Sequence, residues 1–380
     1  PKMAVQLADG STSFDGTNDY IKISDNSDFD FGTGDFTIAF WAKVDDDSTN
    51  ASFIARNNTS TTHSTWFFRI ENNSTITFAN APTQNQYSFA VGTGEWKHYT
   101  ASRIGTTTTV YANGSSVGSF SDSNNYSTNG GDILIGSRTY NNSVTQWYDG
   151  SIANVAIYKG TGLTQAQIQE LMFTEKYSGL SSDLKTNLVS WYDLGSTSES
   201  IVKQDDMSAD NDSNWTSSSG SVTFNTDHYE IVGNSTKHYL TSTTYKAGAS
   251  YKISYDIKNG TASGVGVEPY SQDGSSEIFG SQTVTTSEYV TVTSTFVNGS
   301  ATSSGRVGVR IGNTGGNNIE IKNFKLEQLQ APDSKGSNTG EIYGATTTTG
   351  YTSSPHGVVD PLNYGEVYSG RALSFDGVAD

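Results

Sequence analysis

The sequence contains no cysteine, which excludes disulfide bonds and thiolate metal sites. Basic residues are also scarce: 22 Lys and Arg stand against 39 Asp and Glu, for a net charge of −17. Such an acidic chain is a poor partner for nucleic acid or anionic membranes, because both attract concentrated positive charge. No apolar run approaches the roughly 20 residues of a membrane span. Residues 1–10 also lack the basic-then-apolar pattern of a signal peptide.

Hydrophobic residues make up only 33% of the chain, yet aromatic residues are abundant. A low apolar content is typical of disorder, but 21 Tyr, 17 Phe and 6 Trp are too many for a disordered chain. Thr, Tyr, Val and Phe favour strands, whereas Gly and Asn favour turns. We therefore predict an all-β protein with many short strands, and its 380 residues fit two or three domains.

Strand and turn signals alternate through the first 160 residues. Residues 36–44 alternate along a strand that ends at an acidic run. Asn113-Gly114 predicts a type I′ hairpin turn between two strands. Further strands are expected at 64–71, 75–79, 96–103, 107–112, 116–120, 132–137 and 152–158.

One helix is expected after these strands. Thr164 is suited to the N-cap position, and Gln167 completes a capping box. An apolar stripe follows at Ile168, Leu171 and Met172, which gives the helix one face to bury.

Six motifs then stand in a fixed order between residues 8 and 178. They are Ser-Phe-Asp-Gly-x-x-Asp-Tyr, Phe-Thr-Ile-Ala-Phe-Trp, Gly-Glu-Trp-Lys-His-Tyr, Val-Tyr-Ala-Asn-Gly, Leu-Ile-Gly-Ser, and Asp-Gly-Ser-Ile-Ala-Asn-Val-Ala-Ile-Tyr followed by Leu-Thr-Gln-Ala-Gln-Ile. This set resembles the laminin-G-like, concanavalin A-like jelly-roll family. The resemblance implies a β-sandwich over residues 1–179 with one short helix at its end. It leaves the function open, because this sandwich serves lectins, adhesins, enzyme appendages and virion proteins.

The motif at 13–19 recurs at 374–380 with five of seven residues identical, so we expect a second module and a chain that continues beyond Asp380. Residues 187–194 resemble the opening strand of such a module, whose next turn is found only at 333–340. We therefore assign 180–198 and 331–380 to an incomplete second laminin-G-like module, with a domain inserted at 199–330. The alternative is a row of separate domains in which 187–194 is a linker strand.

The stretch 199–330 is also β-rich. Its alternating strands at 251–258, 290–296 and 306–311, with a last strand at 319–327, resemble a galactose-binding-like jelly roll of the carbohydrate-binding-module type. Such modules commonly carry a calcium-holding Asp in the last strand, where this chain has Lys322-Asn323.

No catalytic pattern is present, so we predict that the chain is not an enzyme. The five histidines have no metal-ligand spacing, and no strand carries the paired acids of sandwich glycosidases. Asp15, Asp19 and Asp149 lie in turns where the resembling family sometimes places calcium, so structural calcium is the one cofactor we consider. Tight Asp-Gly turns explain the same residues, and we favour that interpretation.

Sugar sites combine an aromatic face with polar groups that bind hydroxyls. Loop aromatics beside amides are therefore the candidates. They are Trp147 and Tyr148 with Asn142, Tyr87, and, in the inserted domain, Tyr270 and Trp215.

The module combination in an Asn-, Ser- and Thr-rich chain resembles appendages of tailed phages. It implies a fibre or capsid decoration on the virion surface that binds cell-surface or environmental glycans, contacts other virion proteins and forms a homo-oligomer such as a trimer. Two alternatives stay open. One is a structural virion protein without ligand, and the other is the non-catalytic part of a bacterial secreted adhesin or glycoside hydrolase.

Overall fold

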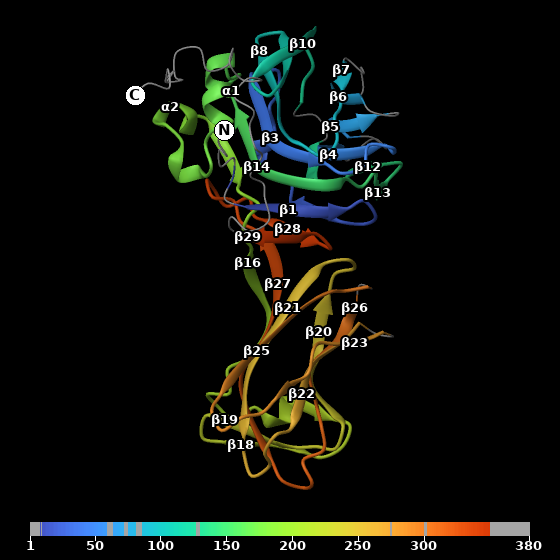
Figure 1. The fold of residues 1–380 in the computed structure, drawn as a ribbon, viewed down its shortest axis with the longest axis vertical. Helices are drawn as coiled ribbons and strands as arrows, with labels where there is room; N and C mark the ends of the chain where they lie inside the picture. Colours follow the sequence, from blue (N-terminus) through green and yellow to red (C-terminus); the bar gives the residue numbers. More distant parts are fainter. Residues whose placement is uncertain are drawn as a thin grey trace, which may run out of the picture. The chain divides into compact units, whose positions relative to one another are not determined.

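The computed structural model describes residues 8, 10–58, 64–71, 75–80, 86–126, 130–273, 276–299 and 302–349. The chain divides into two units (Figure 1). The first consists of Pro1–Thr197, Ala331–Gly340 and Ala345–Asp380, and the second of Ser198–Gln330 and Glu341–Gly344. The second unit therefore interrupts the first in sequence.

One sheet of the first unit has the order β10-β9-β8-β3-β14-β1-β29, with β15 paired to β14. Its pairings in the described residues are antiparallel. The strands are β1 (Gly10–Asp15), β3 (Phe36–Val44), β8 (Trp96–Ile104), β9 (Thr107–Ala112), β10 (Ser115–Ser121), β14 (Asp149–Lys159), β15 (Leu188–Tyr192) and β29 (Thr346–Thr349).

The facing sheet of the first unit runs in the order β2-β11-β4-β5-β6-β7. Its strands are β2 (Tyr20–Ile23), β4 (Ala51–Asn58), β5 (Trp66–Glu71), β6 (Thr75–Asn80), β7 (Gln86–Ala90) and β11 (Gly130–Ile135). Aromatic rings fill the space between the two sheets: Phe40 of β3 packs against Phe68 of β5 and Tyr99 of β8. A short hairpin of β12 (Arg138–Tyr140) and β13 (Ser143–Thr145) forms a separate two-stranded sheet.

The predicted helix is confirmed as α1 (Gln165–Leu171), and both hydrogen bonds of its Thr164–Gln167 capping box are present. Its apolar stripe covers the outer face of the β3 sheet, where the indole of Trp41 donates to the backbone oxygen of Met172 at 3.0 Å. That cover explains why β3 is buried on both faces. The predicted hairpin turn is also confirmed, since Asn113 and Gly114 both have positive φ, at 50° and 74°.

The remaining helical segments are short. They are α2 (Ser182–Lys185) and the 3₁₀ turns Ser27–Phe29, Tyr177–Gly179 and Asp212–Asn214. Within the described residues, no helix is long and apolar enough to span a membrane.

The segments expected to begin a second module extend the first sandwich in this structure. Strand β15 pairs with β14, and β29 pairs with β1. The repeated motif at 374–380 lies outside the described residues, so the second module itself stays a prediction.

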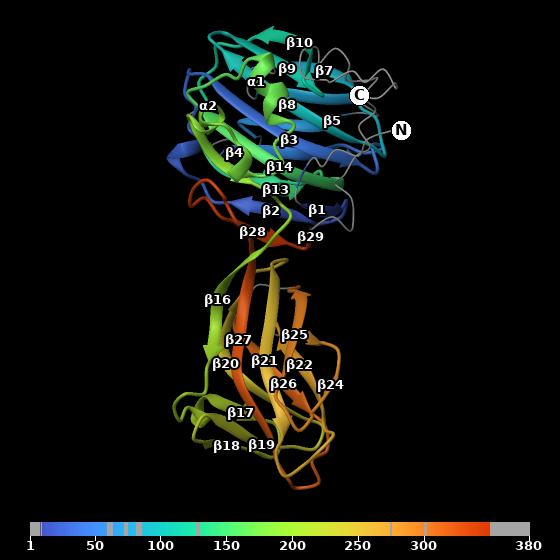
Figure 2. The ribbon, with the colours of Figure 1, turned by 60° about the vertical axis from the view of Figure 1, so that its left-hand side comes forward.

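The second unit is a β-sandwich of its own (Figure 2). In one sheet β27 (Ile319–Ala331) pairs with β16 (Ser198–Asp205) and β19 (His228–Val232) on one edge and with β21 (Ser250–Asn259) on the other. Strands β18 (Ser221–Asn225) and β25 (Val290–Val297) extend it.

The other sheet of the second unit has the order β17-β20-β26-β22-β23, with β24 paired to β22. Its strands are β17 (Trp215–Ser217), β20 (Thr236–Tyr245), β22 (Gly266–Gln272), β23 (Glu277–Phe279), β24 (Thr283–Val284) and β26 (Thr302–Ile311). Strand β28 (Gly340–Tyr343) has its first residue in the first unit and the rest in the second. The all-β prediction is confirmed.

A candidate ligand site beneath the β12–β13 hairpin

Strand β5 alternates between the core and the outer face of its sheet. Trp66, Phe68 and Ile70 are fully buried in the sandwich, so Phe67 and Arg69 point the opposite way. The β12–β13 hairpin covers this outer face, because the guanidinium carbon of Arg138 lies 4.4 Å from the centre of the Phe67 ring.

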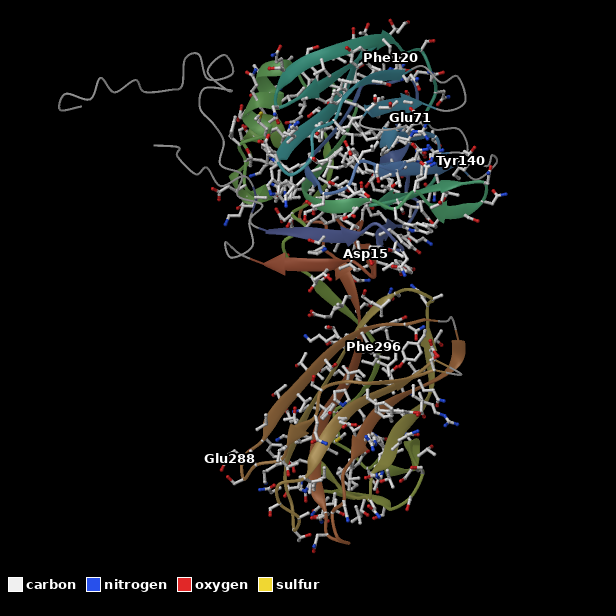
Figure 3. The ribbon with its side chains drawn as sticks, turned by 45° about the vertical axis from the view of Figure 1, so that its right-hand side comes forward. Asp15, Glu71, Phe120, Tyr140, Glu288 and Phe296 are labelled. Carbon is white, nitrogen blue, oxygen red and sulfur yellow. The ribbon has the colours of Figure 1, made fainter. Side chains whose placement is uncertain are left out.

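The two arginines converge on one aromatic ring. The guanidinium carbon of Arg69 lies 4.6 Å from the centre of Phe67, on which Arg138 also packs. Arg138 is 2% exposed and lies 5.2 Å from the ring centre of Tyr140 at the hairpin tip. Arg69 forms an ion pair with Glu71 of its own strand. Figure 3 labels Glu71 and Tyr140 on the same side of the first unit.

Several polar atoms of β4, β5, the hairpin and the residues that flank it are buried and have no hydrogen-bond partner among the described residues. They are Ser52 Oγ, Arg69 Nε, Ser137 Oγ, Arg138 Nε and Nη1, Gln146 Oε1 and Trp147 Nε1. A buried polar atom without a partner costs about 1–3 kcal/mol. We call these six residues, together with Phe67 and Tyr140, the hairpin cluster.

Register and a backbone hydrogen bond bring Ser52, Arg69 and Gln146 together. Ser52 and Arg69 are register partners on β4 and β5, and the amide of Ser52 donates to the carbonyl of Gln146 at 2.8 Å. Three residues of the hairpin and its flank have a left-handed φ. They are Asn141 and Asn142 at the hairpin turn, at 51° and 62°, and Gln146, at 55°. The two Asn values are those of an ordinary type I′ hairpin turn, whereas a left-handed Gln146 is uncommon.

Arg138 shares one nearby acid with Arg69, because the carboxylate of Glu71 pairs with Arg69 and its charge also acts on Arg138. No ion pair involves Arg138 in the part of the chain that the structure describes. Burial, and then the nearby positive charge of Arg69, lower the pKa of Arg138 to about 10. The side chain therefore stays charged at neutral pH, and the cluster carries two cations against the single carboxylate of Glu71.

Of the predicted sugar-binding residues, two belong to the hairpin. Asn142 is exposed at its turn, and Trp147 is half-buried directly after it. The prediction for Tyr148 is wrong. This ring is fully buried against Phe53 and its hydroxyl donates to the carbonyl of Lys43, because the residue after Trp147 points into the sandwich.

Tyr87 does not face the hairpin cluster either. It is half-buried on β7, and its ring stands where a side chain at Gly118 of β10 would lie. Tyr87 therefore packs across the two edge strands of the sandwich and shows no ring face next to the cluster.

The two predicted sugar-binding residues of the second unit are core residues. Trp215 is 7% exposed, and its indole donates to Asp205 Oδ2 at 2.9 Å. Tyr270 is fully buried, and its hydroxyl donates to Gln272 and Glu277 at 3.0 and 3.2 Å. Neither ring offers a free face, so these predictions are wrong. Neighbouring amides in the sequence do not reveal which face of a strand a ring occupies.

Sequence reasoning missed the exposed aromatic residue of the second unit, Phe279. Its side chain is 41% exposed, and the cations of Arg310 and Lys237 lie 5.5 and 5.9 Å from its ring centre. It borders a cavity of about 230 Å³ that Pro269 also lines. The signal available in the sequence was one Phe within a polar, Gly-bounded loop. Arg69 and Arg138 were missed as well, although basic residues are rare in this chain.

The three predicted calcium ligands lie around the first Asp-Gly turn. Asp15 Oδ1 accepts from the amide of Thr17 at 2.8 Å, and Asp19 Oδ2 accepts from the amide of Asp15 at 3.1 Å. Burial, then the charge of Asp15, raise the pKa of Asp19 to about 6. Burial also raises the pKa of Asp149.

Calcium would need several oxygens around one point. Within the described ranges, no group of three or more His, Asp or Glu side chains is arranged to hold a metal ion. The residues present therefore fit a hydrogen-bonded turn better than a calcium site, and calcium stays a prediction that the structure does not support.

Comparison with known families bears on the first unit. Residues 15–169 match the model of the concanavalin A-like lectin/glucanases superfamily. They form a concanavalin A-like domain. The predicted family resemblance is confirmed for this part of the chain, and the hairpin cluster lies within the concanavalin A-like domain. A comparison with curated proteins found no match.

Three solved structures are among those similar to parts of the chain. A pentraxin from Limulus polyphemus is 17% identical, with 43% of this chain and 82% of that chain covered and a TM-score of 0.35. A xylan-binding domain from Paenibacillus barcinonensis is 12% identical, with 36% and 99% covered and a TM-score of 0.29. An arabinanase domain from Geobacillus stearothermophilus, in complex with arabinotriose, is 17% identical, with 43% and 76% covered and a TM-score of 0.34. These likenesses say nothing about what this chain binds.

Proposed function

We propose that this chain is a non-catalytic carbohydrate-binding protein and that the hairpin cluster of its concanavalin A-like domain is a sugar site. The observation that carries the proposal is that Arg69 and Arg138, which have buried nitrogens without a partner among the described residues, both pack on the ring of Phe67, with Tyr140 beside Arg138. Sugars present both hydroxyl groups and apolar C–H faces, so they match this combination.

Tyr140 and Trp147 supply the aromatic part of the site. Tyr140 is 37% exposed at the hairpin tip, and Trp147 is half-buried at the base of the hairpin, two residues after β13. The polar part comes from the side chains beneath them, which have donors and acceptors free for hydroxyl groups.

The setting in which such binding would operate is a further part of the proposal. We favour display on the surface of a virus particle, where several weak sites would bind a glycan-covered surface together. The alternatives are a structural virion protein without ligand and the binding part of a secreted bacterial adhesin or glycoside hydrolase. Imaging the native assembly that contains the chain separates them, since a virion component would be found as a repeated feature of the particle.

The test of the sugar site compares two tyrosines of the same domain. Tyr140 lies beside Arg138, and Tyr177, which packs against the helical side of the sandwich, has the ammonium of Lys185 5.3 Å from its ring. The intact chain is screened on a glycan array, and the strongest ligand is then titrated calorimetrically. We expect Tyr140→Ala to weaken binding by about tenfold, or about 1.4 kcal/mol, and Tyr177→Ala to leave it unchanged. Absence of any glycan binding, or equal losses in both variants, would refute the assignment.

A second site is proposed around Phe279 in the second unit. The supporting observation is an exposed ring, flanked by two cations, at the edge of a cavity. The test adds Phe279→Ala to the chain that already carries Tyr140→Ala. We expect the glycan binding that remains in the single variant to fall in the double variant. Equal binding in the two would exclude this second site.

A further inference from the structure

The unpartnered atoms of the hairpin cluster are mostly donors. Arg138 Nε and Nη1, Arg69 Nε and Trp147 Nε1 can only donate hydrogen bonds, whereas Gln146 Oε1 is the one obligate acceptor among the cluster's unpartnered atoms. The hydroxyls of Ser52 and Ser137 can do either. Donors cannot satisfy one another, so the group that completes this cluster must be rich in acceptor oxygens.

The charge balance of the cluster also favours a ligand that carries negative charge. Two guanidinium groups pack on the ring of Phe67, at 4.4 and 4.6 Å, and Glu71 balances only one of them. An unbalanced cation that is 98% buried is costly, because the protein interior replaces water poorly around a charge. An anion beside Arg138 would remove both the charge imbalance and the donor excess.

We propose, resting on the proposed function, that the sugar bound at the hairpin cluster is acidic, with a carboxylate or a sulfate ester that pairs with Arg138 and Arg69. Hydrogen bonds from a charged guanidinium to the oxygens of such a group are roughly twice as strong as neutral ones. A neutral sugar would leave the buried donors of Arg138 with weaker acceptors and its charge unbalanced.

Entry of an anion requires movement of the hairpin, because the free atoms of Arg138 are buried. The β12–β13 pair joins no other sheet in the described residues. Two hydrogen bonds fix its middle: the amide of Thr139 donates to Asn57 Oδ1 at 3.3 Å and Ser64 Oγ donates to the carbonyl of Thr139 at 3.3 Å. Opening of this cover would break these two hydrogen bonds and separate Arg138 from the ring of Phe67.

The experiment uses three matched saccharides: a galacturonic acid hexamer, its fully methyl-esterified form, and a sulfated galactose hexamer. Each is titrated into the intact chain at low and high salt. We expect at least one acidic hexamer to bind ten times or more tightly than the neutral ester, and salt to weaken that binding. The carboxylated and sulfated arms identify which acid group the site takes.

Three variants connect the preference to the cluster. Arg138→Gln removes the buried charge, Arg69→Gln removes the partly exposed one, and Lys185→Gln removes a distant cation as the matched control. We expect the first two variants to abolish the acid-over-ester ratio and the control to keep it. Arg69 is 15% exposed, so its variant tests the proposal even if Arg138→Gln folds poorly.

The outcomes separate this inference from the function on which it rests. Equal binding of acid and ester, with loss of both in Tyr140→Ala, would overturn the acidic-sugar inference and leave the sugar site standing. An acid preference that survives both arginine variants would also overturn it. Failure of every saccharide here, together with an empty glycan array, would refute the sugar site itself.

Discussion

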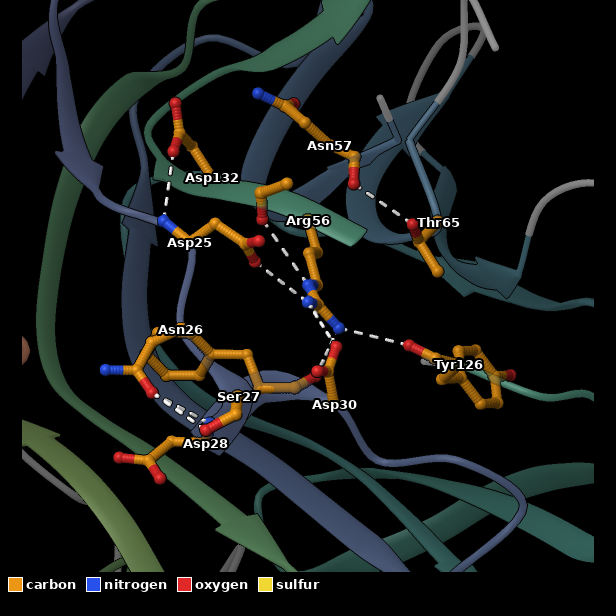
Figure 4. Close-up of polar contacts among 12 residues, drawn as sticks. Asp25, Asn26, Ser27, Asp28, Asp30, Arg56, Asn57, Thr65, Tyr126 and Asp132 are labelled. Atoms are coloured by element: carbon orange, nitrogen blue, oxygen red, sulfur yellow. Dashed lines mark hydrogen bonds and ion pairs between the residues drawn. The ribbon is translucent and has the colours of Figure 1, made fainter. Parts of the chain in front are cut away.

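Two buried arginines of the concanavalin A-like domain are held in opposite ways. Arg56 is 1% exposed, and it donates to the carboxylates of Asp25 and Asp30 at 3.0 and 2.7 Å and to the carbonyl of Tyr126 at 3.0 Å (Figure 4). Arg138 is 2% exposed, packs on aromatic rings, and has two nitrogens without a partner among the described residues. Equal burial therefore accompanies two different roles.

The two arginines differ in whether protein acceptors replace the water that each guanidinium loses on burial. Arg56 replaces every contact with water by a protein acceptor, so it links the segment around the first 3₁₀ turn to β4 and to the carbonyl of Gly131. Arg138 loses its water without such replacement, which is unfavourable unless another molecule supplies the acceptors. The first is a structural residue, and the second is the basis of the proposed ligand site.

The strongest test of the comparison is Arg56→Met. Removal of this guanidinium leaves two carboxylates and several carbonyls without their donor, so we expect a loss of about 3 kcal/mol in the free energy of unfolding. The measurement is thermal unfolding followed by circular dichroism, where the melting temperature should fall by roughly 6–12 °C. A melting temperature equal to that of the unmodified chain would contradict the structural role.

A buried histidine of the same domain differs from Arg138, because it can lose its charge by releasing a proton. His98 is 2% exposed, its ring lies edge-on to Trp41, and burial lowers its pKa to about 3 from the usual 6.5. It is therefore neutral in the folded protein. Its contribution to stability is present above pH 6.5 and is lost as the pH falls toward 3, because only the unfolded chain takes up the proton.

His98→Phe should therefore make stability less sensitive to acid. The variant keeps a ring beside Trp41 but cannot bind a proton, so the fall in melting temperature between pH 7 and pH 4 should be smaller than in the unmodified chain. His238 of the second unit, whose pKa is lowered to about 4 by burial, remains in the variant, so some sensitivity to acid should remain. If the melting temperature falls equally in the variant and the unmodified chain between pH 7 and pH 4, then His98 does not contribute to the acid sensitivity.

The smallest expected effect is that of Arg138→Met. This change removes an unbalanced buried charge and keeps an apolar stem against Phe67, so the free energy of unfolding should change by no more than about 1 kcal/mol in either direction. Thermal unfolding of the intact chain followed by circular dichroism, as for Arg56→Met, provides the measurement. A loss as large as that of Arg56→Met would make Arg138 a second structural arginine.

Local features of the fold were predictable from the sequence. The capping box of Thr164 and Gln167 and the positive φ values at Asn113 and Gly114 depend on a few neighbouring residues. The ordered motifs of the first domain likewise identified its family. These signals are short-range, so no knowledge of distant contacts was needed.

The candidate site was only partly predictable. Trp147 and Asn142 lie at the hairpin, as expected of loop residues, but the arginines beneath them come from β5 and β12, about 70 residues apart. Tyr148, Trp215 and Tyr270 also have polar neighbours in the sequence, as Trp147 does, yet they fill the cores. Only the pairing of distant strands decides which ring is covered.

The sequence by itself thus determined an acidic, cysteine-free, all-β chain, the family of its first domain, and the position of its capped helix and tight turn. The tertiary structure decided which of the buried charges find partners. That outcome depends on which side chains from remote strands meet at one point, and hydrogen bonds and ion pairs form only within a few ångströms. For Arg56 the fold supplies acids, and for Arg138 it leaves two nitrogens without a partner among the described residues.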